Sequence, residues 1–312
     1  MRLKPSGQRW DVVGVGANAV DLVNVVPVYP QPLGPASKVR VGRRVLSCGG
    51  QTANAMATCA AFGLRACYVG ATGSDEQGRL VREALAARGV DAVHVITREA
   101  TNQFAVIILD EPTGERVILW DRDERLLLRD DEIPSEAIRS ARLLHVDDVD
   151  GRAAIRAAAL AREAGVVVTS DIDSVDSHTE NLIAAVDVPI FDEHLPIRLT
   201  GAPDTESALR ALRGRWGSLM CATLGARGAM ALDGDRLHRS PGFAVRAIDT
   251  TGAGDVFRGG FIYALLQEWP IERVLEFANA AAAISCTRIG AMNGIPLLDE
   301  VHAMIRCGGR NS

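Results

Sequence analysis

The segment DTTGAGDVF, residues 249–257, joins a strand-like run to an apolar run with helical spacing. The run before it, GFAVRAID (242–249), predicts a strand, and the run after it, DVFRGGFIYALLQEW (255–269), predicts a helix. The glycines therefore fall at a helix N-terminus. The first N–H groups of a helix have no intrahelical partner, and the helix dipole is positive there. The segment thus predicts an anion site.

The residue types in this segment favour phosphate chemistry. Gly252 and Gly254 allow the backbone to approach a phosphate, and the N–H groups of Gly252, Ala253 and Gly254 would stabilise the charge that develops during transfer. Asp255 lies beside this site as a candidate general base, and the positive helix end should keep it ionised. The alternative is that Asp255 only caps the helix and the glycines only turn the chain.

Short β-rich runs alternate with Ala-rich amphipathic runs along the chain, as in RACYVGATG (65–73) followed by GRLVREALAARG (78–89). This alternation predicts an α/β fold with a mostly parallel sheet covered by helices, and we expect a three-layer αβα sandwich in one domain over residues 1–312. Gly63, Gly89 and Gly165 are the expected helix ends.

Two segments, 22–47 and 100–124, read as strands without helices. The first contains several prolines, and the second predicts a hairpin around residues 112–114. Together they could form a small β-sheet. Such a sheet could be a lid over a cleft or an ordinary extension of the edge of the main sheet.

The composition narrows the classes of partner. The net charge of -5, from 39 acidic and 34 basic residues, gives no basic footprint for nucleic acid. No apolar stretch of signal-peptide or membrane-spanning length is visible, so we expect a cytoplasmic protein with no membrane partner. The six cysteines show no C-x-x-C pairing and are expected to be reduced.

Several motifs resemble one known family. DTTGAGDVFRGG (249–260) is similar to the C-terminal signature of the ribokinase-like (pfkB) family of sugar and nucleoside kinases. SCGGQTAN (47–54), followed by the G-x-D-x-x-G of residues 73–78, resembles the N-terminal signature. With GANAVD (16–21), TLGARG (223–228) and CTRIGAMNGIP (286–296), the resemblance covers nearly the whole chain. It implies ATP-dependent phosphorylation of a sugar hydroxyl.

The resemblance also suggests a substrate class. GGQTAN replaces the GGKGAN of ribokinase itself, which argues against ribose, and the motifs look more similar to ketose-type kinases such as sulfofructose kinases and ketohexokinases. The resemblance implies that the sugar hydroxyls are held by Asn18, Asp21, Gly49, Gly50, Asn54 and Asp255, with Gln103 as a lid residue that reads stereochemistry. A carboxylate such as Asp21 can accept two adjacent hydroxyls, although an Asp that starts a turn is the alternative.

For the nucleotide, the resemblance implies contacts from Asp192, Thr223, Gly225, Gly228, Gly252, Gly254 and Asn279. A solvated helix residue is the alternative for Asn279. Family members often have Asn-x-x-Glu near the phosphates and Mg²⁺, whereas this chain has Asp192, Glu193, His194 and Leu195. Asp192 or Glu193 could act through water, so the placement of Mg²⁺ stays open.

Many family members also bind a monovalent cation beside the anion site. The matching groups are Asp249 and Thr251 with the backbone of Ser285, Arg288, Gly290 and Gly294. Oxygen ligands suit a hard cation such as K⁺. The family's lid sheet often pairs two subunits, which implies a homodimer.

Specific residues exclude some alternative functions and leave others open. VVGVGANA (12–19) fits a dinucleotide-binding G-x-G-x-x-A, but no acidic residue lies between Asp21 and Asp75 to hold the ribose. No P-loop motif, zinc spacing or EF-hand loop is present. A nucleoside kinase of the same fold and a catalytically weak sugar-sensing protein remain as alternatives.

Overall fold

The computed structural model describes residues 2–217 and 219–310. The strands are β1 (Trp10–Val15), β2 (Ala19–Val26), β3 (Arg43–Gly49), β4 (Ala66–Gly73), β5 (Asp91–Arg98), β6 (Phe104–Asp110), β7 (Arg116–Asp121), β8 (Ala141–Asp147), β9 (Val167–Ile172), β10 (Val188–Phe191), β11 (Met220–Thr223), β12 (Ala229–Asp233) and β13 (Arg236–Ser240). The helices are α1 (Gln51–Ala61), α2 (Glu76–Ala87), α3 (Ser135–Arg139), α4 (Gly151–Glu163), α5 (Thr179–Ala185), α6 (Leu195–Thr200), α7 (Thr205–Trp216), α8 (Ala253–Leu266), α9 (Ile271–Ser285), α10 (Ala291–Gly294) and α11 (Leu298–Cys307).

In the described part of the chain, the large sheet has the strand order β13-β12-β11-β10-β9-β8-β1-β4-β5. The pairs from β10–β11 through to β4–β5 are parallel, and β11, β12 and β13 pair antiparallel at one edge. The chain proceeds from β1 to β4 on one side and later to β8 on the other. Ligand crevices form at such a switch in strand order, outside the carboxyl ends of the strands.

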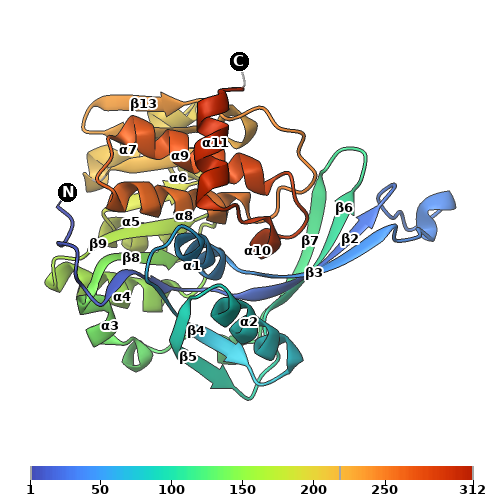
Figure 1. Ribbon diagram of the computed structural model, residues 1–312, viewed down its shortest axis with the longest axis horizontal. Helices are drawn as coiled ribbons and strands as arrows, with labels where there is room; N and C mark the ends of the chain where they lie inside the picture. Colours follow the sequence, from blue (N-terminus) through green and yellow to red (C-terminus); the bar gives the residue numbers. More distant parts are fainter. Residues whose placement is uncertain (1, 218, 311–312) are drawn as a thin grey trace.

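Helices cover both faces of this sheet, as the alternation of motifs predicts (Figure 1). One apolar core joins α1, α2, α8, α9 and α11 to one face, and a second joins α3, α4, α5, α6 and α7 to the other. The expected α/β fold with three layers is therefore confirmed. The expected helix ends are also confirmed, because Gly63, Gly89 and Gly165 have φ values of 86°, 74° and 67°.

The helices α1 and α8 lie in backbone contact on the first face. A Cβ at Gly259 would lie 2.5 Å from Thr58 Cβ and 2.9 Å from Ala55 O. Only glycine permits this approach, because real Cβ atoms do not come so close to other heavy atoms. The N-termini of the two helices are thereby fixed relative to each other.

A second, four-stranded sheet projects from one side of the large one, in the order β3-β2-β6-β7 (Figure 1). The segments expected to be strands without helices build it, and β6 and β7 form the predicted hairpin. Its inner face carries Val23, Val25, Ile107 and Leu109, all buried. We call this sheet the small sheet.

The strand predicted at residues 242–249 is wrong. Apart from an isolated bridge between Phe243 and Arg310, this run is irregular. It begins with Gly242, just after Pro241 and the end of the edge strand β13, and its apolar side chains line a pocket instead of pairing in a sheet. In the described residues no helix has the length and apolar character needed to cross a membrane.

Candidate active site

The anion loop is the segment 249–254 that leads into α8. Gly252 precedes the helix with φ 76°, a left-handed conformation that favours glycine, and its hydrogen in place of a Cβ avoids overlap with Ala291. Asp249 organises the loop, because its Oδ1 accepts from the Thr251 N–H at 2.9 Å and its Oδ2 from the Gly290 N–H at 2.8 Å. The predicted helix start at the glycines is therefore present.

Asp255 lies in the first turn of α8, where capping does not explain it. The helix start has no side-chain cap, and the Asp255 carboxylate instead accepts a hydrogen bond from Asn54 Nδ2 at 2.6 Å. Removal from solvent in the cleft raises the pKa of Asp255 to about 6, with Asn54, Arg258 and Arg116 opposing the rise. The carboxylate is thus mostly ionised at neutral pH, though less strongly than its position at a helix start predicts.

Asp21 faces the same space from β2. It is 6% exposed, and a Cβ at Gly49 would overlap its Oδ2. Burial, together with the charges of Asp255 and Asp249, raises the pKa of Asp21 to about 7. The effect of these two carboxylates on the pKa of Asp21 could not be predicted from the residues near Asp21 in the sequence, because Asp249 and Asp255 come from the other end of the chain.

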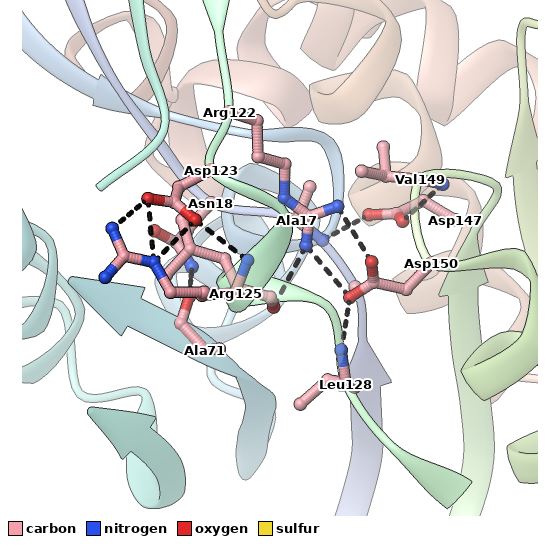
Figure 2. A network of polar contacts seen from close by, with 12 residues as sticks. Ala17, Asn18, Ala71, Arg122, Asp123, Arg125, Leu128, Asp147, Val149 and Asp150 are labelled. Atoms are coloured by element: carbon pink, nitrogen blue, oxygen red, sulfur yellow. Dashed lines mark hydrogen bonds and ion pairs between the residues drawn. The ribbon is translucent and has the colours of Figure 1, made fainter. Parts of the chain in front are cut away.

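Asn18 and Gly50 complete the wall at the carboxyl end of β1. Asn18 Nδ2 donates to Ala71 O at 2.7 Å and to Tyr68 Oη at 2.9 Å, and Figure 2 shows the side chain directed toward Ala71. Gly50 has φ 94°, and a Cβ there would overlap Asn18 Cα. The structure therefore brings the predicted sugar residues other than Gln103 together around Asp21 and Asp255.

Asp147, at the end of β8, is a site-forming residue that sequence reasoning missed. Its Oδ2 accepts from the Ala17 N–H and from Thr52 Oγ1, both at 2.7 Å, so one carboxylate joins the loop after β1 to the start of α1. Burial raises its pKa to about 7. The acidic run at residues 147–150, directly after a strand, was the available signal.

The returning end of the small sheet is anchored at the same place. Arg122 follows β7 and donates to both oxygens of Asp150, at 2.7 and 3.0 Å (Figure 2). Arg122 and Asp150 are largely buried in this contact. The pair fixes where the small sheet meets the large one.

A buried ion pair beneath the anion loop was also missed. Arg258, one turn after Asp255 on α8, lies 2.5 Å from Asp171 Oδ1 on β9, and both side chains are at most 5% exposed. A Cβ at Gly254 would lie 2.7 Å from Arg258 Nη1. Gly254 therefore leaves room for the Arg258 guanidinium as well as for the approach of a phosphate.

A pocket of about 250 Å³ opens beside the anion loop. Its lining includes five of the predicted nucleotide residues, namely Thr223, Gly225, Gly228, Gly254 and Asn279. Asn279 is 6% exposed and donates to Ser240 O at 3.0 Å, so the alternative of a solvated helix residue is wrong. Ala253 and Phe257 form the wall shared with α8.

Asp192 does not line this pocket. Its Oδ1 accepts from the backbone N–H groups of His194 and Leu195, at 3.0 and 2.7 Å, and so organises the start of α6. Glu193 pairs with Arg227. Among the described residues, no group of three or more His, Cys, Asp or Glu side chains could hold a metal ion.

The residues expected at a monovalent cation lie close together next to the anion loop. Thr251 Oγ1 is buried and has no hydrogen-bond partner among the described residues, and Asp249 is 1% exposed. A Cβ at Gly294 would lie 3.0 Å from Ser285 O, and the Arg288 N–H donates to that same carbonyl. This oxygen-rich set fits a hard cation.

The hairpin of the small sheet contacts the anion loop. Arg116 donates to Thr250 Oγ1 at 2.5 Å, and a Cβ at Gly114 would be 3.7 Å from Ala247 O. Sequence reasoning missed this contact, since the two residues are 134 positions apart.

One row of residues crosses the inner face of the small sheet. Ser47, Asp21, Ala105 and Trp120 are consecutive cross-strand partners on β3, β2, β6 and β7, and partners share a face of the sheet. Trp120 is 67% exposed. Asp21 and Trp120 therefore lie on the same face of the small sheet, with Ala105 between them.

Comparison with known proteins identifies the family. The sequence pattern of the pfkB family carbohydrate kinases matches residues 12–298. The chain is 28% identical to a ribokinase of Haemophilus influenzae over 92% of this chain and 95% of that protein. It is 31% identical to an ATP-dependent ribose-1-phosphate kinase of Halopiger xanaduensis, over 94% and 97% of the two chains.

Solved structures agree with this result. The structure of Arabidopsis thaliana ribokinase complexed with ribose and ATP superposes with a TM-score of 0.81 at 25% identity, covering 95% of this chain and 99% of that one. A crystal structure from Agrobacterium tumefaciens, provisionally named a ribokinase, superposes with a TM-score of 0.90 at 28% identity, covering 97% and 99%.

Proposed function

The chain belongs to the pfkB family of carbohydrate kinases and is an ATP-dependent sugar or nucleoside kinase, and we propose that Asp255 is its general base. The observation that carries this assignment is the position of the Asp255 carboxylate. It lies in the first turn of α8, beside the loop amides, and directly follows Ala253 and Gly254, which line the 250 Å³ pocket.

In the proposed reaction, ATP occupies the pocket with its γ-phosphate against the N–H groups of Gly252, Ala253 and Gly254. Asp255 takes the proton of a sugar hydroxyl as the oxygen attacks phosphorus. The new O–P bond forms, the bond from phosphorus to the β,γ-bridging oxygen breaks, and ADP leaves. The loop amides stabilise the charge on the transferring group.

Asn54 has a supporting role in this reaction. Its Nδ2 donates a hydrogen bond of 2.6 Å to Asp255 Oδ2 and so orients the carboxylate that receives the proton. The same hydrogen bond favours the ionised form of Asp255. Asp21 and Asn18 hold the other hydroxyls of the substrate.

We propose that the reaction uses Mg²⁺ at the phosphates of the nucleotide and a monovalent cation beside the anion loop. Mg²⁺ would neutralise phosphate charge, and because Asp192 and Glu193 are engaged with other partners, water would mediate their contacts to it. The buried Asp249 carboxylate, the Thr251 hydroxyl and the carbonyls near residue 285 are suited to hold K⁺.

The small sheet is proposed to act as a lid that excludes water from the transfer. Its contact with the anion loop through Arg116 supports this role. Its outer face exposes Leu46, Val117 and Leu119, an apolar group suited to pairing with a second copy of the chain. A cytoplasmic location is proposed too, and all six cysteines are free, in keeping with a reducing compartment.

The test is release of ADP from ATP in the presence of a panel of sugars and nucleosides, with and without Mg²⁺ and K⁺. We expect ADP release that depends on one class of acceptor and is lost in Asp255→Asn. Acceptor-dependent release that is unchanged in this variant would refute the role of Asp255.

A further inference from the structure

We propose that the acceptor is an uncharged sugar or nucleoside, and that sugars bearing a phosphate, sulfonate or carboxylate are rejected by a wall of hydrogen-bond acceptors. The inference rests on the proposed function and narrows it. The wall consists of Asn18, Asp21, Asn54 and Gln103.

Two amides in this wall have fixed orientations. Asn54 Nδ2 faces a carboxylate oxygen of Asp255, and Asn18 Nδ2 faces the carbonyl of Ala71, so in each case only the nitrogen can make the contact. Their oxygens are enclosed and have no hydrogen-bond partner among the described residues. Each amide therefore presents an unused acceptor.

Gln103 and Asp21 add further acceptors on the small sheet. Gln103 Oε1 is enclosed without a partner, and Gln103 directly precedes β6, where its backbone carbonyl accepts from the N–H of Val20, the neighbour of Asp21. The Asp21 carboxylate accepts no hydrogen bond from any described residue, and Gly49 has no Cβ that would overlap its Oδ2. Enclosed acceptors without partners are costly unless a ligand supplies donors.

The cations described near this wall are already committed. Arg258 pairs with Asp171 below the anion loop, and Arg122 binds both oxygens of Asp150. Arg116 is held at Thr250, on the phosphate side. None of these three contacts directs a guanidinium at the free amide oxygens.

The consequence follows from donor and acceptor chemistry. A hydroxyl can donate to each free oxygen, whereas phosphate, sulfonate and carboxylate oxygens at neutral pH are mainly acceptors and would face other acceptors. A polar site that a substrate leaves unpaired discriminates by about 10⁴ or more. We therefore expect an anionic sugar to have a kcat/KM at least about a hundredfold below its uncharged counterpart.

The experiment compares matched pairs with the full-length protein: fructose with fructose 6-phosphate, ribose with ribose 1-phosphate, and adenosine with AMP. ADP release and ligand binding by calorimetry are both measured. Preference for the uncharged member of the best pair supports the inference. A higher kcat/KM for an anionic member overturns it while leaving the kinase activity intact.

Binding separates this inference from the proposed function. If an uncharged sugar binds but no ADP forms, the proposed chemistry fails and the acceptor wall stands. If no uncharged member binds under any nucleotide condition, the inference itself is overturned.

Two variants test the wall directly. Gln103→Lys should shift the ratio of kcat/KM values at least about tenfold toward the anionic member, because it replaces an acceptor by a cation. Gln267→Lys makes the same substitution at an exposed position just after the end of α8 opposite the site, and it is the matched control. Equal ratios in both variants would overturn the proposal. Asp21→Asn should weaken uncharged-sugar binding at least about tenfold, with melting temperature as the check on folding.

Discussion

Asn54 and Asp255 are separated by 201 residues, yet Asn54 Nδ2 and Asp255 Oδ2 lie 2.6 Å apart. The contact joins the first turn of α1 to the first turn of α8. It connects the two sequence signatures that resemble the kinase family, so each supplies one member of the same hydrogen bond. The acceptor hydroxyl and the phosphate would therefore be placed by one continuous unit.

Asp255→Asn should lower turnover by about 10² to 10⁴, the usual contribution of a general base. Nucleotide binding should persist, because the loop amides are unchanged. Steady-state ADP release and calorimetry with ATP measure the two effects separately. Loss of ATP binding in proportion to turnover would instead indicate that the anion loop had been disrupted.

Arg116→Gln should move the acid limb of the pH profile to higher pH. Desolvation raises the pKa of Asp255 to about 6, and the charge of Arg116 is one of the influences that lower it. The base acts when ionised, so activity is present above this pKa and is lost as the pH falls through it. Removing the charge raises the pKa further, and log kcat/KM should begin to fall at a higher pH.

Arg44 provides the control for Arg116. Arg44→Gln, in the exposed part of β3, removes a charge from the same small sheet without a contact to the anion loop. Its pH profile should match that of the unmodified protein. An identical shift in both variants would mean that Arg116 has no specific effect on Asp255.

Gly254→Ala should destabilise the fold by about 1 to 3 kcal/mol, as overpacking does. The added Cβ would lie 2.7 Å from Arg258 Nη1, which a buried ion pair with Asp171 holds in place. Chemical denaturation measures the change. Gly214→Ala in α7 is the control, since no atom lies within 4 Å of its Cβ, and it should stabilise by about 0.5 to 1 kcal/mol.

Trp120→Ala should raise the KM for sugar by about tenfold, with a smaller effect on the KM for ATP. The indole shares the inner face of the small sheet with Asp21 and offers an apolar surface to a sugar ring. Leu119→Ala removes an apolar side chain from the opposite face and should leave the sugar KM unchanged. Equal changes in the two variants would assign both residues to the stability or pairing of the small sheet.

Local patterns predicted much of the architecture. The alternation of strands and helices, the glycine helix ends and the hairpin at residues 112–114 depend on neighbours within a few positions, and the structure contains all of them. The strand predicted at residues 242–249 was wrong because the apolar residues of this run line a pocket, which the local sequence does not reveal.

The parts of the site that could not be predicted depend on tertiary contacts. The Arg258–Asp171 pair joins α8 to β9, and Asp147 joins β8 to two loops far earlier in the chain. Likewise, the raised pKa of Asp21 arises from its burial and from the charges of Asp255 and Asp249. No spacing rule connects such residues, since the folded sheet alone brings them together.

The backbone contact between α1 and α8 at Gly259 has a consequence for engineering new specificities. The general base Asp255 and the amide of Asn54 that orients it lie on two helices in backbone contact, whereas Asp21 and Trp120 lie on strands of the small sheet and Gln103 directly precedes another of its strands. Replacing the strands of the small sheet by the corresponding strands of a related kinase should change the specificity for the acceptor without changing the relative positions of Asn54 and Asp255.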